Sequence, residues 1–275
     1  MNWKKGINAW CFPANIELAE MFRQASAHGY TGVELNLADQ GEGAFHLGAS
    51  EDELQAIGQL AGQNGLELPS VSTALLWKYP LTHEDEMVRQ QGMLVVEKMI
   101  EAAAVFGAKT VLVVPGLVTP TVSYDVAYDR ALEAVRKLAK KAEAYGVKIG
   151  IENVWNKFLL SPLEMKRFVD EIDSSWVGAY FDIGNVVQFG FPEQWIRILG
   201  KRIIALHVKD FKTSAGNGTG FVPLLAGDTP FERVVEAIEE IGYEGYIMPE
   251  ITPYGRHPEQ LISQTSQAMD AIFGK

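Results

Sequence analysis

Four ionisable side chains lie at the ends of four apolar segments in the second half of the sequence: Glu152, Asp182, His207 and Glu250. Within each segment the apolar residues alternate, and the ionisable residue has the opposite parity. Successive side chains of a strand point to opposite faces, so each ionisable group points away from the face that the apolar residues use. Carboxylates and an imidazole that converge on one space can hold a divalent metal ion or transfer protons.

A metal ion would relieve an electrostatic conflict at such a site. Three carboxylates in a small, poorly solvated space repel one another, and a divalent cation removes that repulsion. One nitrogen and three oxygen ligands suit Mn²⁺, Mg²⁺, Co²⁺ or Zn²⁺, and the ligand set does not choose among them. Any one of these residues is equally well explained as a solvated strand end, but four on neighbouring strands are not. We therefore predict one divalent metal ion bound by Glu152, Asp182, His207 and Glu250.

The rest of the chain supplies the elements that must position these groups. Apolar segments predict eight strands, over residues 5–10, 30–37, 67–73, 109–114, 147–153, 177–182, 203–208 and 246–251. Amphipathic segments predict helices over 15–28, 50–64, 83–106, 123–145, a segment that begins at 161, 192–199, 229–241 and 258–273. Strict alternation indicates parallel βαβ units, and eight repeats favour a closed (β/α)8 TIM barrel over an open sheet.

The predicted barrel also indicates where an active site would lie. Active sites of such barrels lie at the carboxyl ends of the strands, where the four ionisable groups stand. No Gly-x-Gly-x-x-Gly or Walker-type loop follows a predicted strand, which weakens the dinucleotide-binding alternative. We predict an α/β protein with a (β/α)8 TIM barrel that forms a single domain over residues 1–275.

Composition excludes several classes of partner. The chain has 275 residues and a formal net charge of −11, which repels the phosphates of nucleic acids. No segment approaches the roughly 20 apolar residues of a membrane helix, and the first residues lack the apolar run of a secretory signal. The single cysteine, Cys11, excludes an intrachain disulfide and fits a reducing compartment. We expect a cytoplasmic protein that binds a small molecule and neither nucleic acid nor membrane.

Short motifs around the four groups carry a family resemblance. The motifs are Ile151-Glu152-Asn153, Phe181-Asp182-Ile183-Gly184-Asn185, His207-Val208-Lys209-Asp210 and the terminal Glu250. Together they resemble the xylose isomerase-like TIM-barrel superfamily, and within it the sugar and sugar-phosphate isomerases and epimerases. That branch includes ketose 3-epimerases and L-ribulose- or L-xylulose-5-phosphate 3-epimerases. The resemblance implies a Glu-Asp-His-Glu metal site, the two glutamates as the acid/base pair, and assembly as a homodimer or homotetramer.

Three departures separate this sequence from the free-ketohexose 3-epimerases. Those enzymes typically carry a histidine three residues after the aspartate, where this chain has Asn185. They carry a second acid shortly after the first glutamate, where this chain has Phe158 and Leu159. They carry an arginine after the metal histidine, whereas the nearby cations here are Lys209 and Lys212. The substrate contacts of the free-ketohexose enzymes therefore do not transfer to this chain.

The predicted chemistry is proton transfer at a carbon next to a ketose carbonyl. A metal would act as a Lewis acid toward the charge of a cis-enediolate. Glu152 and Glu250 stand far enough apart round the barrel to flank the substrate, one removing the proton and the other returning it on the opposite face. Return to the same carbon gives 3-epimerisation, and return to the adjacent carbon gives aldose–ketose isomerisation. The sequence does not separate these two outcomes.

Six further residues are predicted to contact the sugar or sugar-phosphate substrate: Lys209, Glu34, Asn185, Lys157, Arg256 and Trp10. Lys209 shares the face of His207, and Glu34 ends a strand on the inner parity, where a buried ion pair is the alternative. The next two lie in loops near the metal ligands, and Arg256 could reach an anionic group. Strand-end aromatic residues could form an apolar wall that limits water, with ordinary packing as the alternative; they are Trp10, Trp77, Trp155 and Phe211.

Other functions remain open at the level of the sequence. A metal-dependent dehydratase or lyase of the same superfamily, such as an inosose dehydratase, would use the same metal site but eliminate hydroxide. A sugar-binding barrel that lost turnover is the non-enzymatic alternative, and the intact ligand set opposes it. An endonuclease IV-like repair enzyme would need many more than five histidines and a basic face, which the net charge of −11 opposes.

Overall fold

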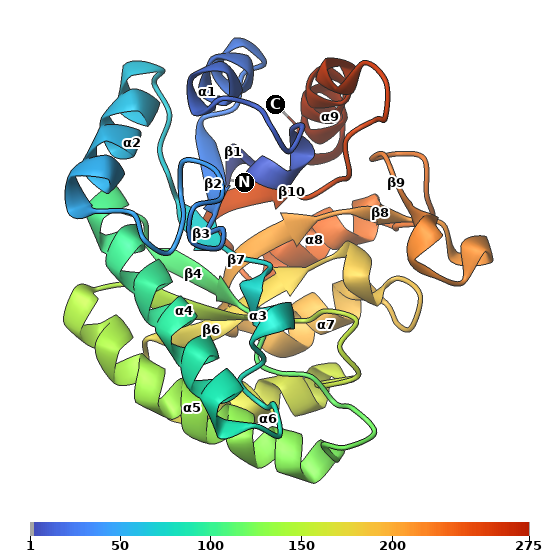
Figure 1. The fold of residues 1–275 in the computed structure, drawn as a ribbon. Coiled ribbons are helices and arrows are strands. Elements are labelled where there is room, and N and C mark those ends of the chain that lie inside the picture. Colours follow the sequence, from blue (N-terminus) through green and yellow to red (C-terminus); the bar gives the residue numbers. More distant parts are fainter. Residues whose placement is uncertain (1–2, 275) are drawn as a thin grey trace.

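Eight parallel strands close into a barrel within residues 3–274, which are the residues that the computed structural model describes (Figure 1). The order round the barrel is β1-β10-β7-β6-β5-β4-β3-β2. The strands are β1 Trp3–Asn8, β2 Gly32–Asn36, β3 Ser70–Ser72, β4 Thr110–Val113, β5 Lys148–Glu152, β6 Val177–Asp182, β7 Ile203–Val208 and β10 Gly245–Pro249. The predicted barrel is confirmed, because every predicted strand segment contains one of these strands or overlaps it.

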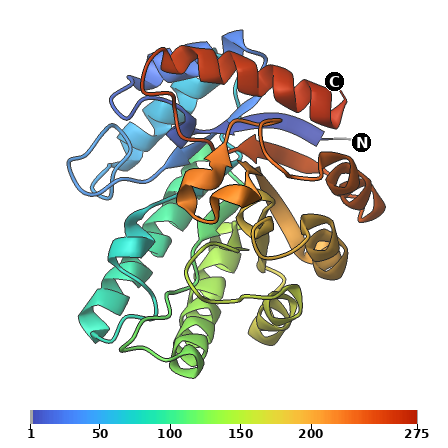
Figure 2. The same ribbon diagram turned by 90° about the vertical axis from the view of Figure 1, so that its right-hand side faces the viewer.

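Helices surround the barrel and alternate with its strands (Figures 1 and 2). They are α1 Leu18–Ala27, α2 Glu51–Gln63, α4 Glu86–Phe106, α5 Tyr124–Tyr145, α6 Pro162–Ile172, α7 Pro192–Leu199, α8 Phe231–Glu240 and α9 Pro258–Phe273. Local chemistry sets their ends. Ser50 and Glu53 form a capping box at the start of α2, and α4 and α5 end at Gly107 and Gly146, both in the left-handed conformation.

The hydrophobic core lies between the strands and the helices. Outward-facing strand residues such as Ile149, Ile151 and Leu206 are fully buried, as their alternation predicts. The two ends of the described chain lie side by side (Figure 2): the Trp3 indole Nε1 donates to the carbonyl oxygen of Phe273 at 3.1 Å. The inner face of the barrel is different, because polar side chains occupy it near the carboxyl ends of the strands.

The loop at residues 209–228 is more ordered than its glycine content suggests. It contains an antiparallel hairpin of β8 Asp210–Phe211 and β9 Phe221–Val222. The buried Asp210 carboxylate holds this loop, since it accepts hydrogen bonds from the backbone N–H groups of Phe211, Gly227 and Thr229. The sequence predicts neither this hairpin nor the short helix α3 Leu75–Lys78, which follows β3.

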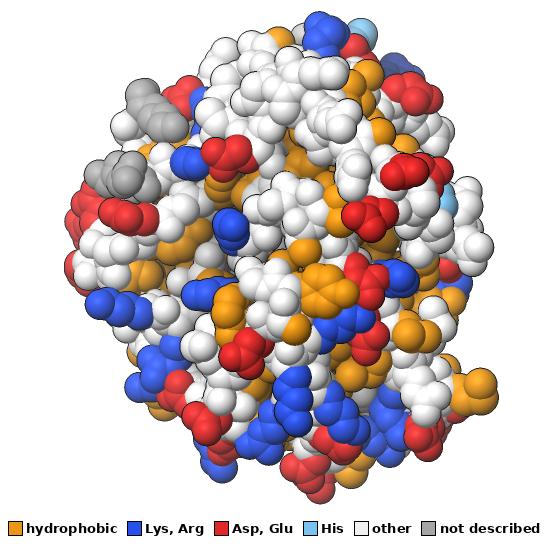
Figure 3. Space-filling model, turned by 90° about the vertical axis from the view of Figure 1, so that its left-hand side faces the viewer, with side chains coloured by type: hydrophobic (Ala, Val, Ile, Leu, Met, Phe, Trp, Pro, Cys, Tyr) orange, Lys and Arg blue, Asp and Glu red, His pale blue; other side chains and the backbone are white. Residues whose placement is uncertain are grey.

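The outer surface carries interspersed charges of both signs. Figure 3 shows Lys and Arg side chains alternating with Asp and Glu over the face on the left of Figure 1. Some of these charges pair between helices, as Lys141 of α5 does with Glu97 and Glu101 of α4. Within residues 3–274, no helix is long and apolar enough to cross a membrane.

Candidate metal centre and active site

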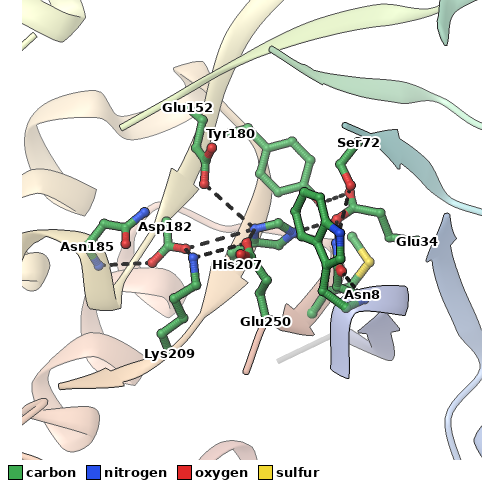
Figure 4. A network of polar contacts seen from close by, with 12 residues as sticks. Asn8, Glu34, Ser72, Glu152, Tyr180, Asp182, Asn185, His207, Lys209 and Glu250 are labelled. Atoms are coloured by element: carbon green, nitrogen blue, oxygen red, sulfur yellow. Dashed lines mark hydrogen bonds and ion pairs between the residues drawn. The ribbon is translucent and has the colours of Figure 1, made fainter. Parts of the chain in front are cut away.

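The four predicted metal-binding residues converge at the carboxyl end of the barrel (Figure 4). One ligand atom from each of them lies within 4.8 Å of the others. Glu152 ends β5, Asp182 ends β6 directly opposite His207 of β7, and Glu250 follows β10. The register between neighbouring strands therefore brings together side chains that are almost 100 positions apart in the sequence. We call these four residues the acidic quartet.

Lys209 adds a positive charge to the acidic quartet. Its ammonium Nζ lies 2.7 Å from Asp182 Oδ2 and 3.0 Å from Glu250 Oε2, and its side chain is only 12% exposed. Gly184 makes room for it, because a Cβ on Gly184 would lie 2.4 Å from the Cβ of Lys209. The structure thus places Lys209 on the face of His207, as its spacing predicts, with its ammonium group against two of the carboxylates.

The carboxylates of the acidic quartet experience opposing electrostatic effects. Burial, and then the negative charges of Glu250 and Asp182, raise the pKa of Glu152 to about 8 against the attraction of Lys209. Burial would also raise the pKa of Glu250, but Lys209 and His207 outweigh it and lower that pKa to about 2. The repulsion between carboxylates that the sequence predicts is therefore present, and the single ammonium group of Lys209 compensates only part of it.

The acidic quartet fits a divalent cation. The buried atoms His207 Nδ1 and Asp182 Oδ2 have no well-directed hydrogen bond among the described residues, although Glu250 and Lys209 lie close by. Both atoms belong to the group that could hold a metal ion. Three carboxylates and one ammonium carry a formal charge of −2, which a divalent cation would balance.

Two asparagines fix the backbone around Asp182. Asn153 Oδ1 accepts from the Asp182 backbone N–H, and Asn153 Nδ2 donates to the Asp182 carbonyl, both at 2.8 Å. The Asn185 backbone N–H donates to Asp182 Oδ1 at 3.0 Å, and Asn185 Nδ2 donates to the carbonyl of Asn153. The predicted substrate-binding residue Asn185 therefore lies beside the acidic quartet, but its side-chain N–H group is bonded to the protein backbone.

Glu34 contacts His207 on the side of the imidazole that faces away from the other three carboxylates. Its side chain is fully buried, and its Oε1 lies 2.7 Å from His207 Nε2. Asn8, Ser70 and Tyr180 donate further hydrogen bonds to the same carboxylate. Both carboxylate oxygens are thus bonded to protein groups, which favours the buried alternative over the predicted substrate contact. The three donors are not predictable from the sequence, because a lone Asn, Ser or Tyr in a strand carries no spacing signal.

The other predicted contacts lie at the rim of the site. Lys157 is exposed, with a φ of 60°, and lines a groove of about 500 Å³ together with Asn153 and Asn185. Arg256 is exposed in the loop after β10, and Trp10 is half-buried in the turn after β1. Neither is part of the acidic quartet.

Part of the predicted aromatic wall is present. The Trp155 ring packs against Phe211 and Phe221 of the hairpin, with centroids 5.4 Å and 5.3 Å apart, and against Phe189. The Lys209 ammonium lies 5.8 Å from the centre of the Phe221 ring. Trp77, in contrast, is 44% exposed. The hairpin, which was not predicted, thus brings Phe221 to the site.

Comparison with known proteins identifies the family. The family model described as "Xylose isomerase-like TIM barrel" matches residues 22–272. The chain belongs to this family. An L-ribulose-5-phosphate 3-epimerase, UlaE of Escherichia coli, is 24% identical over 97% of this chain and 93% of its own length.

Solved structures of other proteins share the fold. The D-psicose 3-epimerase of Clostridium cellulolyticum H10, solved with D-tagatose, has a TM-score of 0.79 at 18% identity and covers 98% of both chains. The IOLI protein, whose structure contains a zinc atom, has a TM-score of 0.81 at 18% identity and also covers 98% of both chains. These likenesses confirm the TIM barrel over almost the whole chain.

Proposed function

We propose that this protein is a divalent-metal-dependent ketose or ketose-phosphate 3-epimerase. The observation that carries the proposal is the acidic quartet, which combines three carboxylates and one imidazole nitrogen within 4.8 Å at the catalytic end of the barrel. The 3-epimerase names of the relatives support the choice of reaction, and the zinc atom in the IOLI structure supports a metal. The donor set suits Mn²⁺, Mg²⁺, Co²⁺ or Zn²⁺.

In this proposal, Glu152, Asp182, His207 and Glu250 would hold the metal ion. A cation held there would supply Lewis-acid stabilisation of negative charge on the substrate oxygens. Glu152 and Glu250 come from strands on different sides of β6 and β7, so their carboxylates can approach the substrate carbon from different directions. One removes the proton and the other returns it on the opposite face, which inverts that carbon.

Lys209 and the aromatic side chains have supporting roles in this mechanism. The Lys209 ammonium group, already within 3.0 Å of two carboxylates, can donate to a substrate oxygen that becomes negative. Trp155, Phe211 and Phe221 form an apolar cluster beside it, which limits the access of water to the enediolate. Arg256 and Lys157 at the rim are proposed contacts for an anionic group of the substrate, with Trp10 and Asn185 as further contacts.

The decisive experiment is proton exchange at carbon. Purified protein is loaded with Mn²⁺, and L-ribulose 5-phosphate and free D-psicose are incubated separately with it in deuterated water. We expect deuterium at carbon 3 together with formation of the 3-epimer, and no exchange after treatment with a chelator.

Three other outcomes would contradict the proposed 3-epimerisation. Deuterium at carbon 2 of an aldose product would indicate aldose–ketose isomerisation. Loss of water from the sugar would indicate a dehydratase. Binding of Mn²⁺ and sugar without any exchange would refute the enzymatic proposal.

A further inference from the structure

The buried carboxylate of Glu34 makes an unusually complete set of contacts. Its Oε1 accepts from Asn8 Nδ2 at 2.5 Å and lies 2.7 Å from His207 Nε2. Its Oε2 accepts from Ser70 Oγ at 2.5 Å and from Tyr180 Oη at 2.7 Å. The side chain is fully buried, so water does not compete for either oxygen. A carboxylate in such a position is held in one orientation by four separate strands, β1, β3, β6 and β7.

The contacts of Glu34 determine the role of each His207 nitrogen. An ionised carboxylate only accepts hydrogen bonds, and a neutral imidazole has one donor nitrogen and one acceptor nitrogen. Three other groups donate to Glu34, as they would to an ionised carboxylate. The short contact with Nε2 is then a hydrogen bond only when Nε2 carries the proton. The lone pair of the neutral ring is then on Nδ1.

Nδ1 is the nitrogen that faces the acidic quartet. It lies 2.9 Å from Glu250 Oε2, 3.9 Å from Asp182 Oδ2 and 4.0 Å from Glu152 Oε1. Figure 4 shows His207 between the two groups, with Glu34 and Asn8 on one side and Glu152, Asp182 and Lys209 on the other. The Tyr180 ring also packs on the imidazole, with centroids 4.6 Å apart, so the ring cannot easily rotate.

We propose that Glu34 is a positioning residue that fixes the orientation and tautomer of His207, so that Nδ1 is the metal-binding nitrogen. The inference rests on the proposed metal site and goes beyond it, because it assigns a function to a residue outside the four proposed ligands. A carboxylate that accepts the second N–H of a metal-binding histidine raises the basicity of the ligand, and its loss typically weakens metal affinity by about 10–100-fold. The same proposal removes Glu34 from the set of substrate contacts.

The experiment compares Zn²⁺ binding by the wild type, E34Q, S70A and H207A. Glutamine has the shape of glutamate, but its amide offers His207 either a neutral acceptor or a competing donor. We expect the affinity of E34Q for Zn²⁺, measured by competition with a chromogenic chelator, to fall by about 10–100-fold. Ser70 is the matched control because it donates to the other oxygen of Glu34 and leaves the contact with His207 in place. S70A should bind Zn²⁺ almost as tightly as the wild type.

Ring nitrogen NMR gives a readout that does not depend on activity, and its main observation needs only the wild type. With histidine labelled by ¹⁵N, the zinc-loaded wild type should show Nδ1 as the metal-bound nitrogen and Nε2 with a downfield, hydrogen-bonded proton. In E34Q that proton should move upfield, since its acceptor is weaker. Zinc on Nε2 in the wild type would overturn the inference even if E34Q failed to fold.

The outcomes separate this inference from the proposed function. If the wild type bound no Zn²⁺, or if H207A bound it as tightly as the wild type, the metal site and this inference would both fall. If H207A lost binding but E34Q behaved as the wild type does, only the role of Glu34 would fall. An equal loss in E34Q and S70A would assign the effect to general disruption of the buried network and would also overturn the inference.

Discussion

Replacing Lys209 by methionine tests the electrostatic balance of the acidic quartet. The ammonium group lies 2.7 Å and 3.0 Å from two buried carboxylate oxygens, and its side chain is 12% exposed. Removal of one partner from a buried ion pair typically costs about 3–5 kcal/mol, because the remaining charge stays buried without compensation. For a chain of this size 1 kcal/mol corresponds to roughly 2–4 °C in Tm, so K209M should melt about 6–20 °C below the wild type in the presence of a chelator.

Added metal should restore much of this loss. A divalent cation among the three carboxylates supplies the positive charge that K209M lacks, so the Tm difference between variant and wild type should fall by more than half at saturating Mn²⁺. Differential scanning calorimetry with and without Mn²⁺ measures both values. K212M is the matched control, because Lys212 is an exposed lysine of the same loop, and its Tm should stay within about 2 °C of the wild type. A K209M deficit that is the same with and without metal would refute the reasoning.

Three further predictions concern individual proposed ligands. E152Q and E250Q should each abolish carbon-bound proton exchange while the protein remains folded by circular dichroism; full activity in either variant would remove that residue from the acid/base pair. H207A should lower the metal content measured by mass spectrometry to a small fraction of the wild-type value, and unchanged content would exclude His207 as a ligand. Burial raises the pKa of Glu152 to about 8, so between about pH 4.5 and pH 8 the folded protein keeps a proton that the unfolded chain has lost. The stability of the metal-free protein therefore falls as the pH rises through this range. E152Q should therefore raise the Tm of the metal-free protein at pH 8 and have little effect near pH 4.5, which thermal melts at both pH values would check.

Much of the barrel is predictable because its signals are local. Period-two alternation marks the strands, and capping residues and glycines mark the helix ends, as at Ser50 and Gly107. The acidic quartet is predictable for the same reason, since parity and strand ends can be read within each segment. Once eight parallel strands close into a barrel, the carboxyl ends of strands that are far apart in the chain must lie together at one end of the barrel.

Contacts across the barrel cannot be predicted from local sequence patterns. Glu34 and His207 are 173 positions apart, and the sequence gives no indication of which inward-facing side chain another one meets. Glu34 was therefore predicted as a substrate contact on parity alone. The hairpin within residues 209–228 was missed for a similar reason. The Asp210 carboxylate holds that loop by accepting from backbone N–H groups of residues as distant as Gly227 and Thr229, and such bonds leave no periodic pattern.

The order of the strands has a consequence for synthesis of the protein on the ribosome. β10 lies between β1 and β7, and Glu250 follows directly after β10. A nascent chain that has released Glu152, Asp182 and His207 still lacks the last carboxylate, and its β1 and β7 both present unpaired edges. Arrival of β10 covers those two edges and delivers Glu250 in one event. A growing chain should therefore gain protection from aggregation at the same point of translation at which its proposed metal site becomes complete, when β10 and Glu250 emerge.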